Sequence, residues 1–564
     1  MISSSRSTAT LKALRVLRPE TDLKIVIAEK VSPATLAILK DQPGWEVVTA
    51  EQIPAGGLGA ALADADALIV RSAVQADAAL LAQAPRLRLI GRAGVGVDNI
   101  DTAEATRRGI VVMNTPGANA VAVAELTLGL MISMARSIPR ANEGLHEGKW
   151  DKKTLQGSEL RGKTLGIFGL GRIGLEVARR AQAFGMELIG YDPFVAPVIA
   201  RENGVTLVGI DEIFSESDYL SLHVGLTPQT EGLINKHSLA IMKKGVRIIN
   251  CARGELIVDE ALIEALRSGH VAGAALDVFR QEPLKNSPYF EIPSVLLSPH
   301  IAGSTDEAQE AIGIQLAHQV RDYLRLGVVQ NAVNVASLSE EEYTEVSPYI
   351  EMAARLGQFL AHAMGTTDGA SIEGLTLNYN GRLAQLKTDL IRNAAIAGLL
   401  HGSEGVNRIN AAAVIAERGI RLNEDKREYA PGGAGDTLRL VVHTAAGDSA
   451  VTGTVLHGSS PRLLRYDGID VEAELAGTLL VIRNNDVPGV IGRIGTILGE
   501  AQLNIANFAL GRKRPEGAKP TQAVAVVQID ISSPAAQAAL PGALDQLRGV
   551  EAISSVRLVE LGKL

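Results

Sequence analysis

The sequence predicts an α/β protein with two doubly wound parallel sheets, followed by an α+β region and a ferredoxin-like sheet. Three observations predict this fold class. The chain has 564 residues, enough for roughly three to five domains at about 100–200 residues each. Short apolar runs alternate with helical patterns over residues 23–303, as in parallel sheets covered by helices. The last region instead reads strand, helix, strand, strand, helix, strand.

The first parallel sheet is predicted within residues 23–121. Its strands are short apolar runs at 23–28, 67–70, 87–90 and 110–113. Helical patterns at 32–40 and 102–108 lie between these runs. A long apolar helix at 122–135 should cross into the next sheet.

The second parallel sheet is predicted within residues 122–303. Its strands are expected at 164–168, 188–191, 219–222, 246–250, 271–276 and 295–297. Six strands are what a complete dinucleotide-binding sheet of the Rossmann type requires. A long helix is expected after this sheet, at 305–326.

Two further regions follow a boundary near residues 331–339. In the first, at 335–470, helices alternate with strands such as 371–379 and 437–443, and glycine-rich segments lie at 430–435 and 458–461. The sequence does not reveal the chemistry of this region. The second, at 477–564, has strands at 477–483, 505–511, 522–529 and 553–558 and helices at 492–500 and 535–547. This βαββαβ order is the ferredoxin-like plan.

Composition excludes several classes of protein. Residues are 46% hydrophobic and 21% charged, with a net charge of −8 and no long run of one sign, so neither nucleic acid nor a membrane is an expected partner. The one cysteine, Cys251, excludes an intramolecular disulfide and argues against a cysteine metal site. We therefore expect a cytoplasmic protein without a metal. Residues 1–22 have the composition of an organellar transit peptide, but a frayed chain start is the simpler interpretation.

A glycine motif follows the strand at 164–168 and begins a helix. Gly169 allows the tight turn, Gly171 lets the backbone approach a pyrophosphate, and Gly174 lets helix and strand pack closely. The next strand ends at Asp192, where a carboxylate can bind the ribose hydroxyls of an adenosine and would repel a 2′-phosphate. The motif therefore predicts NAD as the cofactor.

Three polar residues follow predicted strands of the second sheet: Arg253, Glu282 and His300. Ligands bind at the carboxyl ends of parallel strands, so these side chains are expected in one crevice. Oxidation of an alcohol needs a base for the hydroxyl proton, an acid partner for that base, and a cation that orients the substrate. His300, Glu282 and Arg253 fit these roles in that order.

Two more arginines, Arg71 and Arg92, lie at the ends of first-sheet strands. Both are expected to face the cleft between the two sheets, where two guanidinium groups suit a phosphate dianion. Solvated surface arginines are the alternative interpretation.

These motifs resemble the D-isomer-specific 2-hydroxyacid dehydrogenases. The similarity is carried by the motifs at 70–73, 91–101, 112–117, 169–174, 250–254, 275–279, 282–283 and 298–303. It implies a substrate-binding domain at 23–121 plus 304–333 and an NAD-binding domain at 122–303, with Arg253, Glu282 and His300 as the catalytic set. It places Asn119 near the substrate. It also implies NAD contacts at Val95, Gly169, Gly171, Arg172, Ile173, Gly174, Asp192, Val224, Cys251, Ala252, Arg253, Asp277, His300, Ile301, Ala302 and Gly303, although relatives often carry threonine where Val95 and Val224 stand.

The C-terminal regions resemble those of long members of this family. Residues 335–470 resemble an intervening domain linked to regulation and assembly, and 477–564 resemble an ACT domain, an amino-acid-sensing module. The resemblance implies an L-serine effector site at Asn484, Asp486 and Asn504. Asn484 is a departure, because relatives place histidine or tyrosine there, which puts serine affinity in doubt. A homotetramer is also implied.

The resemblance implies NAD-dependent oxidation of D-3-phosphoglycerate to 3-phosphooxypyruvate, the first step of L-serine biosynthesis. Reduction of 2-oxoglutarate to D-2-hydroxyglutarate is a possible side activity. Two alternatives remain at this point. One is another reductase of the family, acting on glyoxylate or hydroxypyruvate, and the other is a non-catalytic NAD-sensing protein of the corepressor kind.

Overall fold

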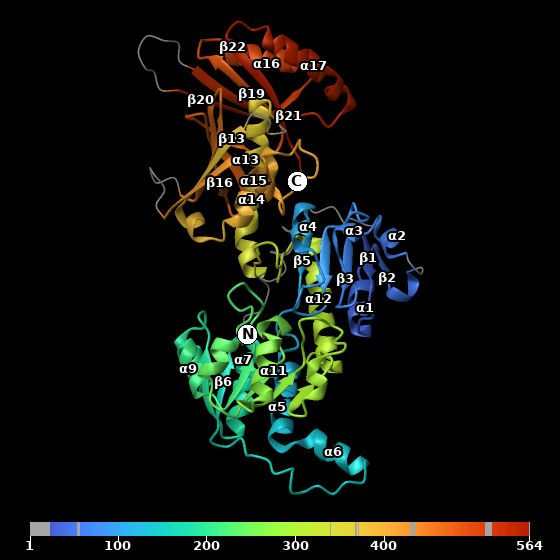
Figure 1. The fold of residues 1–564 in the computed structure, drawn as a ribbon. Coiled ribbons are helices and arrows are strands. Elements are labelled where there is room, and N and C mark those ends of the chain that lie inside the picture. Colours follow the sequence, from blue (N-terminus) through green and yellow to red (C-terminus); the bar gives the residue numbers. More distant parts are fainter. Residues whose placement is uncertain are drawn as a thin grey trace, which may run out of the picture.

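The computed structural model describes residues 23–53, 57–338, 340–366, 369, 372–428, 435–513 and 522–562. The predictions for residues 1–22, Ser371 and 430–434 lie outside the described residues. The described chain contains four sheets, and the two parallel sheets lie at one end of an elongated molecule while the other two lie at the opposite end (Figure 1). The predicted α/β class with two later α+β sheets is confirmed.

The first sheet has five parallel strands in the order β2-β1-β3-β4-β5. The strands are β1 Leu23–Ile27, β2 Trp45–Val48, β3 Ala67–Val70, β4 Leu89–Arg92 and β5 Val111–Met113, and the helices are α1 Pro33–Lys40, α2 Leu58–Leu62, α3 Ala78–Leu81 and α4 Thr102–Arg107. Apolar side chains form a core on each face of the sheet. The sequence analysis missed β2, whose residues are all partly or fully exposed, as befits an edge strand.

The long helix α12, Asp306–Leu326, packs on this first sheet although it follows the second in sequence. Leu316 lies so close to Gly91 that a Cβ added there would be 3.0 Å from its Cδ1 atom. The segment after α12 also stays on the first sheet, because the Asn334 side chain accepts from Val112 N at 2.9 Å and donates to Ile110 O at 2.8 Å.

The second sheet has seven parallel strands in the order β12-β11-β10-β9-β6-β7-β8. The strands are β6 Thr164–Phe168, β7 Glu187–Tyr191, β8 Thr206–Leu207, β9 Tyr219–Leu222, β10 Val246–Asn250, β11 Val271–Leu276 and β12 Val295–Leu297. The helices are α5 Ala120–Arg136, α6 Ile138–His146, α7 Arg172–Ala183, α8 Pro197–Glu202, α9 Ile210–Glu216, α10 Lys236–Ile241 and α11 Asp259–Arg267. The expected count of six strands is too low by one, because two-residue β8 gives no apolar run. Strand order reverses between β6 and β9, where such sheets bind ligands.

The third sheet is mixed, with β14 parallel to β13 and the other neighbours antiparallel, in the order β14-β13-β15-β16-β17-β18. The strands are β13 Ile372–Asn380, β14 Arg421–Arg427, β15 Thr437–Thr444, β16 Gly447–Leu456, β17 Ser460–Tyr466 and β18 Ile469–Glu474, and the helices are α13 Glu340–Met364, α14 Asp389–Leu399 and α15 Ala411–Glu417.

The fourth sheet confirms the ferredoxin-like plan. Its elements are β19 Gly477–Asn485, α16 Val490–Glu500, β20 Asn504–Arg512, β21 Gln522–Asp530, α17 Pro534–Arg548 and β22 Ile553–Leu561, with strand order β20-β21-β19-β22. One face packs on α16 and α17. The other face packs on α13, since Leu479 and Val481 share a core cluster with Phe359 and Leu360. The third and fourth sheets therefore have one common core.

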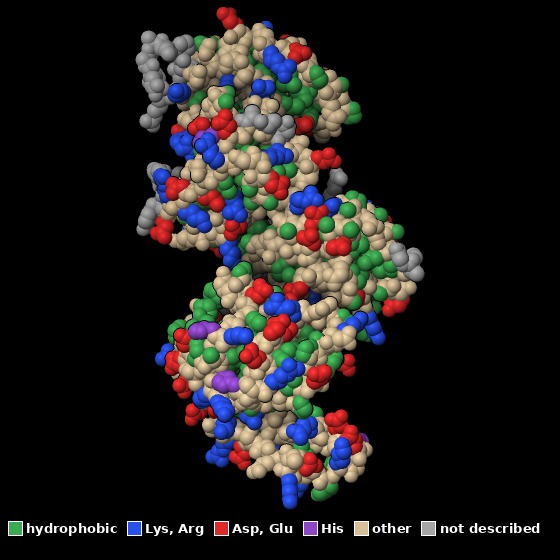
Figure 2. All heavy atoms as spheres, in the orientation of Figure 1, with side chains coloured by type: hydrophobic (Ala, Val, Ile, Leu, Met, Phe, Trp, Pro, Cys, Tyr) green, Lys and Arg blue, Asp and Glu red, His purple; other side chains and the backbone are tan. Residues whose placement is uncertain are grey.

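No single helix among the described residues is long and apolar enough to cross a membrane. Within the described part of the chain, α5 and α6 taken together have the length and apolar composition of such a span, but they are bent by 65° at the break between them. Much of α5 is core, since Ala124 and Met131 are fully buried. Figure 2 shows basic and acidic side chains interspersed on the visible face, without a large area of one sign.

Candidate active site

A cavity of about 820 Å³ lies where strand ends of the first and second sheets face each other. Its lining includes five of the predicted catalytic and substrate residues: Arg71, Arg92, Asn119, Glu282 and His300. The structure therefore brings together residues that the sequence separates by more than 200 positions.

His300 and Glu282 form a hydrogen-bonded pair at this cavity. His300 Nδ1 lies 2.7 Å from Glu282 Oε2, and the other carboxylate oxygen of Glu282 accepts from Phe279 N at 3.0 Å. The carboxylate is thus fixed by its own loop and in turn orients the imidazole. Because Nδ1 donates to the carboxylate, Nε2 of a neutral His300 is left with a lone pair.

The loop that carries His300 is held by a buried acid, Asp277. Asp277 is fully buried, and its carboxylate accepts from Ser298 Oγ at 2.6 Å and from the backbone N–H groups of Ile301 and Ala302, each at 2.9 Å. His300 has φ 53°, a left-handed conformation that is uncommon for residues other than glycine. These contacts hold the backbone in that conformation. The predicted contact between Asp277 and NAD stays a prediction, and the structure gives this carboxylate a role in positioning the loop.

Arg253 lies across the cleft from the first sheet. Its Nε is 3.3 Å from Asp98 Oδ2, and Nη1 donates to Ala252 O at 2.7 Å. Gly96 lies directly against this guanidinium, because an added Cβ would be 2.1 Å from Arg253 Nη2. Arg253 is not among the cavity-lining residues, but Asp98 is, so the ion pair places the guanidinium at its margin.

The predicted substrate residues supply unpaired polar groups to the cavity. Burial, with a contribution from nearby Arg253, lowers the pKa of Arg92 below its ordinary value. Arg92 Nε and Asn119 Oδ1 are both buried without a hydrogen-bond partner. Buried polar groups are normally satisfied, so unpaired ones lining a cavity indicate a polar ligand. Arg71 also lines this cavity, and two guanidinium groups at one end of it suit an anion.

The glycine turn has the geometry that a dinucleotide requires. Gly169 has φ +95° and passes close to His223 O, whereas Gly174 packs so tightly that an added Cβ would be 2.0 Å from Gly169 O. A Cβ at Gly171 would meet nothing within 4 Å, so its side faces open space before the N-terminus of α7. Strand end, turn and helix N-terminus thus have the arrangement that suits a pyrophosphate. The residues present fit NAD.

Other predicted cofactor residues surround this turn. Asp192 at the end of β7 accepts from Leu170 N at 2.8 Å and from Phe194 N at 2.8 Å, which fixes its carboxylate beside the glycines. Arg172 belongs to the second sheet's half of the cleft and donates to Pro116 O in the first sheet's half.

Burial raises the pKa of the Cys251 thiol to about 12, which excludes it as a nucleophile at neutral pH. Val224 lies against Gly169, and Gly303 lies against Asn119. The remaining members are Val95, Ile173, Ala252, Ile301 and Ala302, and their NAD contacts stay predictions.

The three predicted effector residues do not meet within one chain. Asn484 is buried near the end of β19, and Asp486 just beyond it pairs with Arg512 at 3.2 Å. Asn504 begins β20 and pairs with Asp530, at the opposite end of the sheet. About seven residues separate the two ends, roughly 23 Å at strand rise. Within one chain, β19 and β20 run parallel, so Asn484 and Asn504 lie at opposite ends of the sheet, and the effector site at these residues stays a prediction.

Three residues that the sequence analysis did not single out also shape the cavity loops. Asp98 pairs with Arg253. Glu29 accepts from the backbone N–H groups of Arg71 at 2.8 Å and Val74 at 3.1 Å, and Asn99 donates to Arg71 O at 2.9 Å. Asp98 and Asn99 stand inside the recognised 91–101 motif, which was the available signal. Nothing in the sequence marked Glu29.

Comparison with known proteins agrees with this geometry. Residues 128–302 match the model of the D-isomer specific 2-hydroxyacid dehydrogenase NAD-binding domain, and residues 345–467 match that of the D-3-phosphoglycerate dehydrogenase intervening domain. A solved glyoxylate reductase from Paecilomyes thermophila is similar over 55% of this chain and 98% of its own, with 32% identity and a TM-score of 0.51.

Relatives also match over almost the whole length. D-3-phosphoglycerate dehydrogenase of Methanocaldococcus jannaschii is 39% identical over 518 residues, which cover 91% of this chain and 96% of the relative. The enzyme of the same name from Synechocystis sp. is 39% identical over 517 residues, or 90% of each chain. These matches run along about nine tenths of both chains, and the chain belongs to the D-3-phosphoglycerate dehydrogenase family.

Proposed function

We propose that this protein is an NAD-dependent dehydrogenase that oxidises D-3-phosphoglycerate to 3-phosphooxypyruvate, the first step of L-serine biosynthesis. The observation that carries the proposal is the His300–Glu282 pair at 2.7 Å beside a cavity that also holds Arg71 and Arg92. The relatives matched along the whole chain bear the name of this enzyme.

His300 is the proposed base. Its Nδ1 donates to Glu282, so Nε2 accepts the proton of the substrate hydroxyl while the carboxylate stabilises the imidazolium that forms. Arg253 binds the substrate carboxylate and fixes the carbon to be oxidised, in exchange for part of its contact with Asp98. NAD, when bound, supplies the hydride acceptor. Its proposed binding residues are those of the glycine turn and Asp192.

Arg71 and Arg92 are the proposed phosphate-binding residues. Arg92 carries an unpaired buried Nε, which a phosphate oxygen would satisfy. Asn119, with its unpaired Oδ1, is proposed to contact the substrate on the other side, where an oxygen acceptor suits a hydroxyl. The same two arginines suit the distal carboxylate of 2-oxoglutarate, which supports a reductase side activity as a further proposal.

A steady-state assay with NAD tests the main proposal. D-3-phosphoglycerate at alkaline pH should yield reduced cofactor, and hydroxypyruvate or glyoxylate should be poorer substrates in the reverse direction. Preference for an unphosphorylated acid would instead favour another reductase of the family. A protein that binds NAD without turnover would support the sensing alternative.

Further proposals concern the C-terminal half of the chain, which contains the third and fourth sheets. We propose L-serine as an effector at Asp486 and Asn484, where the buried Asn484 Oδ1 has no hydrogen-bond partner. Asn504 can complete such a site only from a second copy of the chain, because it lies at the other end of its own sheet. This supports an oligomer, and the homotetramer and the cytoplasmic location stay predictions.

A further inference from the structure

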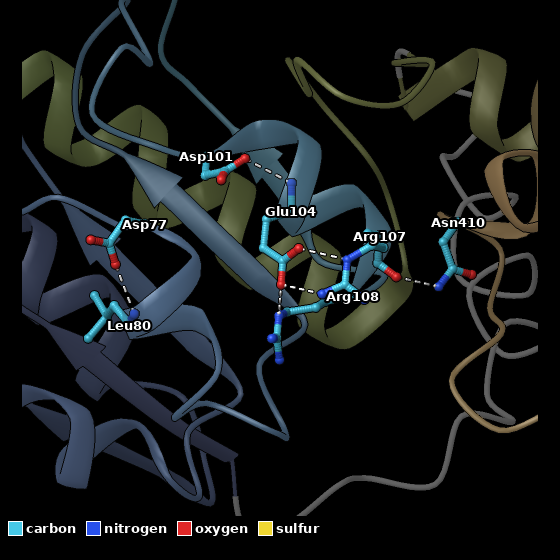
Figure 3. A network of polar contacts seen from close by, with 7 residues as sticks. All are labelled: Asp77, Leu80, Asp101, Glu104, Arg107, Arg108 and Asn410. Atoms are coloured by element: carbon cyan, nitrogen blue, oxygen red, sulfur yellow. Dashed lines mark hydrogen bonds and ion pairs between the residues drawn. The ribbon is translucent and has the colours of Figure 1, made fainter. Parts of the chain in front are cut away.

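The short helix α4 joins two distant parts of the molecule (Figure 3). It spans Thr102–Arg107, about 9 Å at the rise of an α-helix. Asp101 caps its first turn, accepting from Glu104 N at 2.9 Å. A capped helix of this length moves as one unit, so contacts that fix one end also fix the other.

The loop before α4 holds the backbone around Arg71. Asn99 Nδ2 donates to Arg71 O at 2.9 Å and to Val74 O at 2.7 Å. The main chains are tied as well, since Ala76 N donates to Asn99 O at 2.8 Å and Asp101 N donates to Ala76 O at 3.0 Å. The direction in which Arg71 leaves its strand is thus set jointly by the residues that lead into α4, which hold its carbonyl group, and by Glu29, which holds its N–H group.

The other end of α4 contacts the intervening domain. Asn410 Nδ2 donates to Arg107 O at 3.0 Å, and Asn407 Nδ2 lies 3.4 Å from Gly109 O. Asn410 is 1% exposed and is fixed within its own domain, because it also donates to Gly405 O and accepts from Asn407 N, both at 2.8 Å. Gly109 has φ +73°, and an added Cβ would be 1.6 Å from Asn407 Nδ2, so no side chain fits there.

Charge does not make this contact. The guanidinium groups of Arg107 and Arg108 both pair with Glu104, at 2.6 and 2.5 Å, so they turn back along α4 (Figure 3). The last carbonyls of a helix lack partners inside it, and here the amide of Asn410 supplies one. The contact between Asn410 and α4 is therefore a partly buried hydrogen bond to the helix backbone that involves no charged group, and Ile409 beside it packs on the core of the first sheet.

We propose that the intervening domain positions Arg71 through α4, which makes Asn410 and Asn99 positioning residues for the phosphate end of the cavity. The inference rests on the proposed function, in which Arg71 binds the substrate phosphate. Loss of either amide loosens the carbonyl side of the 71–74 loop, while Glu29 still holds its N–H groups, and no charge is removed from the site. Substrate affinity then falls, while the His300–Glu282 pair on the second sheet is untouched.

The test uses Asn410→Asp in the full chain. This variant keeps the acceptor for Asn407 N but loses the donor to Arg107 O and, within its own domain, to Gly405 O. We expect KM for D-3-phosphoglycerate to rise about three- to tenfold, the value of one hydrogen bond, with kcat and KM for NAD unchanged. Asn99→Ala should show the same split. The control is Asn380→Ala, a buried asparagine of the same domain that donates to Thr437 Oγ1 at 3.1 Å and should leave KM unchanged.

A double-mutant cycle with Arg71→Ala separates this proposal from the proposed function. If Asn410 acts through Arg71, Asn410→Asp adds nothing to the KM of Arg71→Ala. Additive effects, or an unchanged KM in Asn410→Asp, overturn the proposal. If Arg71→Ala itself leaves KM unchanged, the phosphate assignment is wrong, and hydrogen exchange then decides the positioning claim. Faster exchange of the Ala73 and Val74 amides in Asn410→Asp supports it, and unchanged exchange overturns it.

Discussion

His300 is where the chemistry of a single residue is most directly testable. Its Nδ1 bonds to Glu282, and its backbone is held by the Asp277 loop, so an asparagine there is smaller but can still offer an amide donor to Glu282, and it has no basic nitrogen. His300→Asn should lower kcat by at least about a hundredfold, the usual contribution of a general base, with NAD affinity near normal. Stopped-flow kinetics measures kcat, and a fluorescence titration with NAD measures the affinity for NAD. Substantial turnover in the variant would show that another group takes the proton.

Cys251 gives a prediction about pH. Burial raises the pKa of its thiol to about 12 from an ordinary 9.0, so at pH 9 roughly one thiol in a thousand is ionised instead of half. The native protein should resist a thiol reagent at pH 9, and the unfolded chain should react at one equivalent. The folded state holds this proton more tightly than the unfolded one, so the free energy of unfolding should also fall as pH rises above 9. Rapid labelling of the native protein would contradict the burial.

The turn between β6 and α7 offers a pair of matched glycines at the scale of an element. An added Cβ at Gly174 would lie 2.0 Å from Gly169 O, while one at Gly171 would meet nothing within 4 Å. Gly174→Ala should therefore destabilise the protein by about 1–3 kcal/mol, the usual cost of overpacking. Gly171→Ala should leave the melting temperature unchanged and weaken NAD binding. Thermal unfolding compares the melting temperatures of the two variants, and titration with NAD compares their affinities for NAD. Equal melting temperatures would show that the helix shifts to accommodate the methyl group.

Elements differed in how well the sequence predicted them, for physical reasons. The strands around the glycine turn were predictable because buried parallel strands are uniformly apolar and the glycines have distinct steric roles. The edge strands β2 and β8 were not, because one is partly exposed and the other has two residues. The position of Asn504 relative to Asn484 was not predictable, because motif spacing does not reveal that β20 starts at the opposite end of the sheet. Glu29 acts on backbone N–H groups, which no side-chain pattern marks.

At the scale of the whole molecule, the effect of L-serine on the reaction velocity tests whether the fourth sheet regulates the active site. Asp486 pairs with Arg512 at the same end of the sheet as Asn484, so a serine there would compete for that arginine or bridge the pair. L-Serine should lower the velocity of the wild-type enzyme, and Asp486→Ala should remove the response without changing KM for phosphoglycerate. Initial rates at increasing serine provide the measurement. An inert wild type would indicate that Asn484 does not support serine binding at this site.

The shared core of the third and fourth sheets makes a prediction about truncation. Helical periodicity shows that α13 is amphipathic but not that it covers two sheets, so the sequence suggested two separate domains. Phe359 and Leu360 are fully buried, and they belong to the same cluster as Val481 and Val559 of the fourth sheet. A chain ending at Glu474 should therefore expose this face of α13 and unfold its third sheet at a lower temperature. A chain ending at Ser337 removes both sheets together and should retain the melting transition of residues 23–337. Calorimetry of the two chains measures whether the third sheet depends on the fourth for its stability. If the third sheet melts at the same temperature after the fourth is removed, each sheet has a sufficient core of its own.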